Sequence, residues 1–67
     1  MLINNSTTFL NSFFFDANTY SADAIDRKVD SFVIQVCIDK KMIDVVYTNG
    51  KRMYRILAEG KKAIKRW

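Results

Sequence analysis

The most regular pattern in the chain is an alternation of apolar and polar residues on both sides of an Asn-Gly pair. Residues 43–48 and 51–56 flank Asn49 and Gly50. Asn-Gly is the preferred two-residue type I′ turn, because both of its positions need a positive φ. One face of the resulting hairpin is apolar toward its base, which predicts that this face is buried. A two-residue loop fixes the register, which pairs Ile43 with Ile56, Asp44 with Arg55, Val45 with Tyr54, Val46 with Met53, Tyr47 with Arg52, and Thr48 with Lys51.

A helix is predicted near the start of the chain. Asn5 or Ser6 can cap a helix that runs to about Phe15. Three consecutive phenylalanines, residues 13–15, cannot all face one side of that helix. We therefore expect at least one of them to be exposed or to lie at an interface, and Phe13 and Phe15 are candidates for protein contact.

Two further helices are predicted before the hairpin. Ser21 is a suitable N-cap for a helix over residues 22–28, and Asp30 or Ser31 for one that runs to about Lys41. The pattern predicts that these helices bury Ala24, Ile25 and Val29, and Ile34, Cys37 and Ile38.

After the hairpin, residues 58–67 have the pattern of a closing amphipathic helix. Its apolar stripe consists of Gly60, Ala63, Ile64 and Trp67. Neither a repeat nor a linker interrupts the chain, so residues 1–67 are expected to form a single α+β domain, of three helices, a hairpin and a short last helix.

Charge is distributed unevenly along the chain. Residues 1–39 hold two basic and five acidic side chains, a net charge of −3, and residues 40–67 hold nine basic and two acidic ones, a net charge of +7. A polyanion would therefore meet the second half of the chain. The alternative is that these lysines and arginines only solubilise exposed surfaces.

The order of these elements resembles the winged-helix variant of the helix-turn-helix. Residues 38–43 look like the end of a recognition helix that runs into the first wing strand, and residues 54–64 are similar to the wing-to-helix motif of MarR-like and PadR-like regulators. Two positions depart from that pattern. Ala58 stands where the family usually has a Thr or Ser N-cap, and Lys41 stands where a glycine is usual.

The resemblance implies a small DNA-binding protein, a transcriptional regulator, whose third helix enters the major groove and whose hairpin, the wing, touches the backbone. The residues implied to contact DNA are Gln35, Lys40, Lys41, Lys51 and Arg52. Arg55 faces Asp44 in the predicted register, so a cross-strand pair explains it better than a ligand contact.

The exposed side of the third helix leaves a second interpretation open. Phe32 and Val36 can touch thymine methyl groups, but an exposed Phe/Val pair serves equally well as a protein-contact patch. The alternative function is a protein-binding winged helix, such as a dimerisation or assembly factor or a mobile-element-encoded inhibitor of a host protein. A homodimer through the phenylalanine-rich first helix is a further possibility.

The chain offers little for catalysis. It has no histidine and a single cysteine, Cys37, which excludes His-based acid–base chemistry and a CxxC zinc or redox site. We expect no enzyme, no metal and no cofactor. Without a disulfide, a signal peptide or the roughly 20 apolar residues of a membrane span, the sequence favours a soluble cytoplasmic protein.

Overall fold

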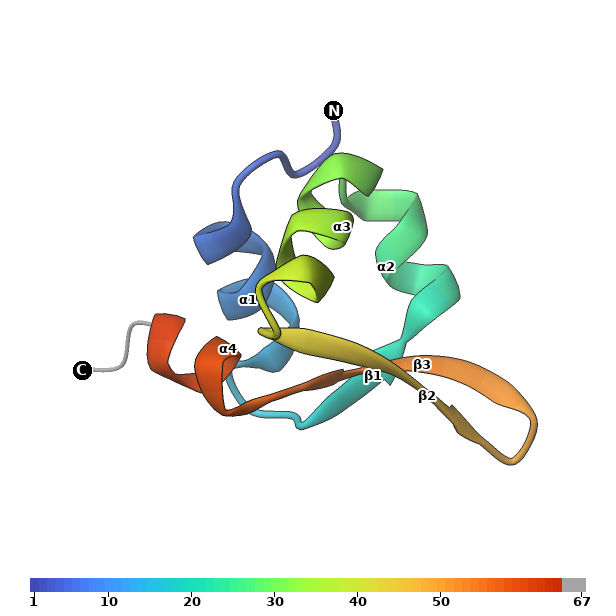
Figure 1. Cartoon of the computed structure of the whole chain (residues 1–67). Coiled ribbons are helices and arrows are strands. Elements are labelled where there is room, and N and C mark those ends of the chain that lie inside the picture. The colour runs from blue at the N-terminus through green and yellow to red at the C-terminus, as the bar shows by residue number, and fades with distance from the viewer. Residues whose placement is uncertain (65–67) are drawn as a thin grey trace.

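Four helices and a three-stranded antiparallel sheet make up the computed structural model, which describes residues 1–64. The predicted α+β class is confirmed. Helices α1, α2 and α3 gather on one side of the sheet, and α4 lies at the end opposite the hairpin turn (Figure 1). The elements follow in the order α1 (Ser6–Phe14), β1 (Thr19–Ser21), α2 (Ala22–Lys28), α3 (Ser31–Asp39), β2 (Ile43–Thr48), β3 (Lys51–Ile56) and α4 (Ala58–Ala63).

The β2–β3 hairpin has the predicted register at all six pairs, from Ile43 opposite Ile56 to Thr48 opposite Lys51. Asn49 has a φ of 52° and Gly50 a φ of 78°. Both values are positive, as a type I′ turn requires. The local chemistry of the turn therefore determines this element.

The helix N-termini follow the predicted caps. The Asn5 side chain accepts a hydrogen bond from the Thr8 amide at 3.0 Å, and the Asp30 carboxylate accepts one from the Phe32 amide at 2.9 Å. Helix α2 has the predicted bounds, and its N-cap Ser21 accepts from the Ala24 amide at 3.5 Å. These side chains satisfy amide groups that have no partner inside the helix.

Helix α3 ends at Asp39, two residues before the predicted end. The Lys41 amide donates to the Ile38 carbonyl at 3.1 Å, and the Met42 amide donates to the Cys37 carbonyl at 2.9 Å. This pair of bonds is a Schellman motif, in which the residue after the cap adopts a left-handed conformation. Lys41 occupies that position with a φ of 62°, where glycine is the usual residue.

Strand β1 was not predicted from the sequence. It has only three residues, and it pairs antiparallel with β3 so that Tyr20 lies opposite Tyr54. The sheet order is therefore β1-β3-β2. A second unpredicted pairing holds the N-terminal segment, where the Ile3 amide donates to the Lys28 carbonyl and the Ile3 carbonyl accepts from the Asp30 amide, both at 2.8 Å.

The core is a single cluster to which α1, α2, α3, β2 and β3 contribute, together with Ile64 directly after α4. Phe13 is only 8% exposed, so the prediction that it is a protein-contact candidate is wrong. Its ring packs against those of Phe9 and Tyr20, because α1 turns it toward the sheet. Val33 is also buried, although it was not among the predicted core positions of its helix.

Helix α4 packs closely against the loop between α3 and β2. The Leu57 amide donates to the Met42 carbonyl at 2.8 Å, and an added Cβ at Gly60 would lie 2.3 Å from the Met42 carbonyl oxygen. Only glycine allows this approach. The helix begins at Ala58 after Leu57, which makes no side-chain cap bond. The predictions for Lys65, Arg66 and Trp67 lie outside the described residues.

Candidate nucleic-acid interface

Helix α3 presents a mixed face to solvent. Phe32 is 73% exposed at its first turn, Gln35 and Asp39 are exposed further along, and Val36 is half-buried between them. The Gln35 amide nitrogen donates to the Asp39 carboxylate at 3.0 Å. Gln35, the only predicted base-reading residue, is thus engaged by a neighbour on its own helix in this structure.

The N-terminal segment borders the apolar part of this face. A shallow hollow of about 250 Å³ lies between α3 and that segment. Its lining consists of Asn4, Asn5, Ser6, Phe32, Val33 and Val36. The Ile3 pairing keeps the segment beside α3, so the hollow is built from residues that the hydrogen bonds of the fold position.

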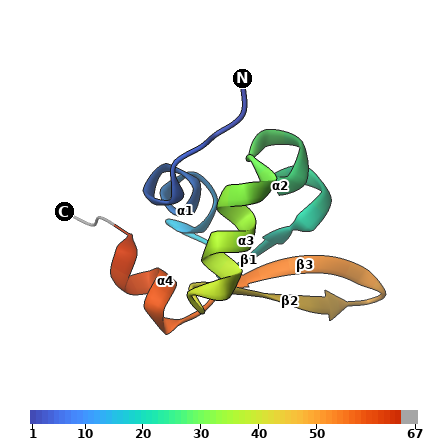
Figure 2. The ribbon, with the colours of Figure 1, turned by 45° about the horizontal axis from the view of Figure 1, so that its top comes forward.

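All three lysines that were predicted to contact DNA are exposed. Lys40 and Lys41 lie side by side after the end of α3, and Lys51 lies at the hairpin turn. None of the three forms an ion pair with another residue of the range 1–64. Figure 2 shows the hairpin extending away from α3, so lysines that follow α3 and a lysine at the hairpin turn come from two separate parts of the fold.

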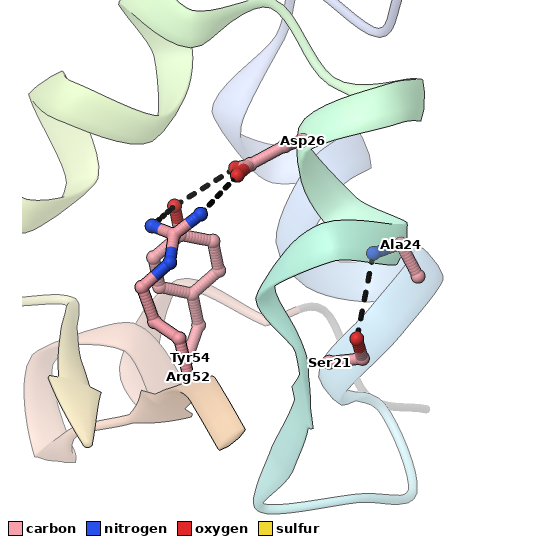
Figure 3. Close-up of polar contacts among 5 residues, drawn as sticks. All are labelled: Ser21, Ala24, Asp26, Arg52 and Tyr54. Carbon is pink, nitrogen blue, oxygen red and sulfur yellow. Dashed lines mark hydrogen bonds and ion pairs between the residues drawn. The ribbon is translucent and has the colours of Figure 1, made fainter. Parts of the chain in front are cut away.

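The fourth basic residue predicted to contact DNA, Arg52, has partners within the molecule, although its side chain is still 38% exposed. Its guanidinium forms an ion pair with Asp26 of α2 and donates to the Tyr54 hydroxyl at 3.1 Å. The Tyr54 hydroxyl in turn donates to the other Asp26 oxygen at 2.8 Å (Figure 3). Unlike the three lysines, Arg52 therefore has an ionic partner in this structure, and its contact with DNA stays a prediction.

The physical reason lies in the hairpin register. Arg52 and Tyr54 are two residues apart on β3, so both point to the face of the sheet that the helices cover. The predicted register already contained this signal, since it placed Arg52 on the same face as Tyr54 and Ile56. Asp26, by contrast, has no pattern in the sequence that marks it as the acceptor.

Tyr54 is the buried member of this group. Burial and the hydrogen bond to Asp26 raise the pKa of the Tyr54 hydroxyl above its ordinary value, with burial the larger cause. The guanidinium of Arg52 also lies over the Tyr54 ring, 5.5 Å from its centroid. The three side chains form a tie between α2 and β3.

Two other ion pairs involve residues of the basic second half. Arg55 bonds Asp44 across the hairpin at 2.8 Å, as the register predicted, and Lys62 bonds Glu59 within α4 at 3.2 Å. These pairs leave fewer cations available to a polyanion than the net charge indicates.

Residues 1–64 contain no cluster of side chains suited to a metal ion, and the cysteine among them is buried. No three Cys, Asp or Glu side chains in this range are grouped closely enough to hold a metal ion. Cys37 is buried on the inner side of α3, and burial raises the pKa of its thiol above the ordinary value. A buried thiol in its protonated form is a poor nucleophile.

The helices of the described chain are also short. None between residues 1 and 64 has the length and apolar character needed to cross a bilayer. Comparison with known proteins gives no match to any family model, curated protein or solved structure, so the function has to be inferred from the side chains themselves.

Proposed function

We propose that this chain is a winged-helix domain that binds double-stranded DNA, as a small transcriptional regulator does. In this proposal α3 lies toward the major groove, and Lys40, Lys41 and Lys51 contact phosphates on either side of it. The observation that carries the proposal is that these three exposed lysines have no ionic partner within residues 1–64. Unpaired cations that flank an exposed helix provide the electrostatic part of DNA binding.

The α3 side chains favour backbone binding over base reading. Gln35 is bonded to Asp39, and Asp39 itself would lie close to phosphates. Phe32 is the large apolar side chain that the helix exposes, and it can contact only a thymine methyl or another apolar group. We therefore expect weak sequence preference and a strong dependence of affinity on salt.

The experiment is a fluorescence anisotropy titration of a labelled random-sequence duplex at two salt concentrations. Three phosphate contacts predict that affinity falls roughly 40-fold between about 50 and 200 mM salt. The double variant Lys41→Glu/Lys51→Glu should bind more weakly and with a shallower salt dependence. Its matched control is Arg27→Glu/Lys28→Glu, which changes the net charge equally at the end of α2.

Two outcomes would contradict DNA binding through this surface. One is the absence of binding at the lower salt concentration. The other is an equal loss of affinity in the two double variants, since that would reflect net charge alone and not the position of the lysines.

A second candidate function rests on Phe32 and the hollow beside it. An aromatic side chain that is 73% exposed, next to a hollow lined by two valines and three polar residues, is typical of a protein-contact surface. The substitution Phe32→Ser separates the candidates. If α3 lies in the groove, this change lowers DNA affinity at both salt concentrations; if α3 binds a protein, DNA affinity stays unchanged.

A further inference from the structure

Strand β2 forms one edge of the sheet and leaves a row of backbone groups unpaired. Within residues 1–64 it pairs only with β3. Thr48 and Lys51 flank the two-residue turn as a hydrogen-bonded pair, and hydrogen-bonded and non-bonded pairs alternate along an antiparallel ladder. The amide and carbonyl groups of Val45 and Tyr47 therefore point away from β3, toward the open edge.

This edge lacks the usual protection against pairing with another chain. Proteins protect edge strands by making them short, by adding Lys or Pro, by bulges, or by inward-pointing charges. Strand β2 has six residues in unbroken register and contains neither Lys nor Pro. Its one charged residue, Asp44, is paired with Arg55. The other edge strand, β1, has only three residues.

Apolar side chains are exposed along the same strand. Tyr47 is 71% exposed and Val45 is 39% exposed, and both lie on the face of the hairpin that carries buried Tyr54. The turn end of the hairpin extends past the helices (Figure 1), and both side chains are open to solvent. A further strand can add to a sheet edge that offers free backbone groups for hydrogen bonds and apolar side chains for contact, and β2 offers both.

The strand is complementary to itself in one register. A two-fold axis through Val46 pairs β2 antiparallel with β2 of a second copy, and places each Val45 opposite Tyr47 of the other chain. Asp44 then lies opposite Thr48, so no like charges face each other. An axis through Asp44 would place the Asp44 carboxylates of the two copies opposite each other. An axis through Val45 would place Tyr47 opposite Ile43, whose side chain is already buried in its own core.

We propose that β2 is a homodimer interface, at which two copies of this chain join their sheets edge to edge into one six-stranded antiparallel sheet. The exposed Val45 and Tyr47 side chains then cover each other across the two-fold axis. Two residues on each chain exchange backbone hydrogen bonds, which gives four intermolecular bonds. This interface does not depend on DNA binding, and it replaces α1 as the expected dimer surface.

The test is sedimentation equilibrium of the full chain without DNA, over a wide range of concentration. About 0.15 M salt is suitable, because the screening length is then about 8 Å and the charge of +4 on each copy opposes association less. We expect a monomer–dimer equilibrium. Val45→Lys should abolish the dimer, because it places a charge at the edge. Thr19→Lys, the same change of charge at the opposite edge strand, should leave the dimer intact.

A charge pair tests the register. In Val45→Lys/Tyr47→Glu, each introduced lysine lies opposite the introduced glutamate of the other copy, so the dimer should return. Circular dichroism establishes that each variant is folded. A chain that stays monomeric at all concentrations, a dimer that survives Val45→Lys, or a double variant that stays monomeric would each overturn the proposal.

Discussion

Lys41 combines a structural cost with a candidate functional role. Its φ of 62° at the end of α3 belongs to the left-handed region, which costs an L-residue roughly 1–2 kcal/mol. The Schellman bonds from the amides of Lys41 and Met42 hold it there. The exposed Lys41 ammonium is also one of the three cations on which the proposed DNA binding rests.

Lys41→Gly should therefore raise stability and lower DNA affinity. We expect the free energy of unfolding to increase by about 0.5–1 kcal/mol, since glycine removes the strain but makes the unfolded chain more flexible. Thermal unfolding followed by circular dichroism should shift upward by about 2–8 °C. The slope of log affinity against log salt should fall by about 0.9, the effect of one phosphate contact.

Lys40→Gly is the control for this change. Lys40 has a φ of −86°, so glycine relieves no strain there while it still adds flexibility to the unfolded chain. This variant should lose stability. Equal stability changes in the two variants would show that backbone conformation at position 41 is not the cause.

At the scale of elements, the features that depend on neighbouring residues are predicted well from the sequence. The pairings between distant segments are not. The hairpin register follows from Asn49 and Gly50 alone, and the caps at Asn5, Ser21 and Asp30 act within three residues. Strand β1 has no comparable signal, because its partners on β3 are more than 30 residues away. The end of α3 was predicted too late, since Lys40 and Lys41 are good helix formers and the terminating bonds are formed by backbone groups.

The tie that Asp26, Arg52 and Tyr54 form between α2 and β3 makes the free energy of unfolding depend on pH in the alkaline range. The pKa of Tyr54 is raised in the folded state, so its contribution is complete below the unfolded pKa of about 10. As pH rises through the folded pKa the hydroxyl ionises, and this stability is lost. We expect urea denaturation to show a steeper fall in the free energy of unfolding above about pH 10 in the native chain than in Tyr54→Phe.

The same substitution should cost about 1 kcal/mol at neutral pH, because it removes the hydrogen bond from the hydroxyl to Asp26. Tyr47→Phe is the matched control, since its side chain is 71% exposed. It should leave both the neutral stability and the alkaline fall unchanged. A Tyr54→Phe variant with the native alkaline profile would contradict this role for the tie.

At the scale of the molecule, the sequence predicts which residues of the candidate interface are exposed better than it predicts which of them pair with residues of other elements. Lys40, Lys41 and Lys51 are exposed, but Lys40 and Lys41 follow α3 and are not part of it as predicted. The sequence does not indicate that Arg52 is paired with Asp26, which lies 26 positions earlier in the chain and accepts its hydrogen bond. Pairings between separate elements depend on how helices pack on the sheet, and neither periodicity nor net charge specifies that packing.

The phenylalanines show how the whole fold gives one residue type two different roles. Phe9 is fully buried at the centre of the core, where its ring contacts those of Phe13 and Phe14 at centroid distances of 5.9 Å. Phe9→Ala should cost about 3–5 kcal/mol. A domain of this size has a total stability of only about 3–10 kcal/mol, so the variant should be partly or wholly unfolded.

Phe32→Ala removes the same side chain from a site that is 73% exposed. Its free energy of unfolding should stay within about 0.5 kcal/mol of the native value, because few core contacts are lost. Urea denaturation of both variants measures the difference directly. A large loss in Phe32→Ala would mean that its ring stabilises the N-terminal segment through the hollow beside it, and Phe32 would then be a structural residue and not part of a binding surface. If Phe32→Ala is as stable as the native chain, the DNA titration can distinguish the two candidate functions, because any change in affinity then comes from the missing ring and not from unfolding.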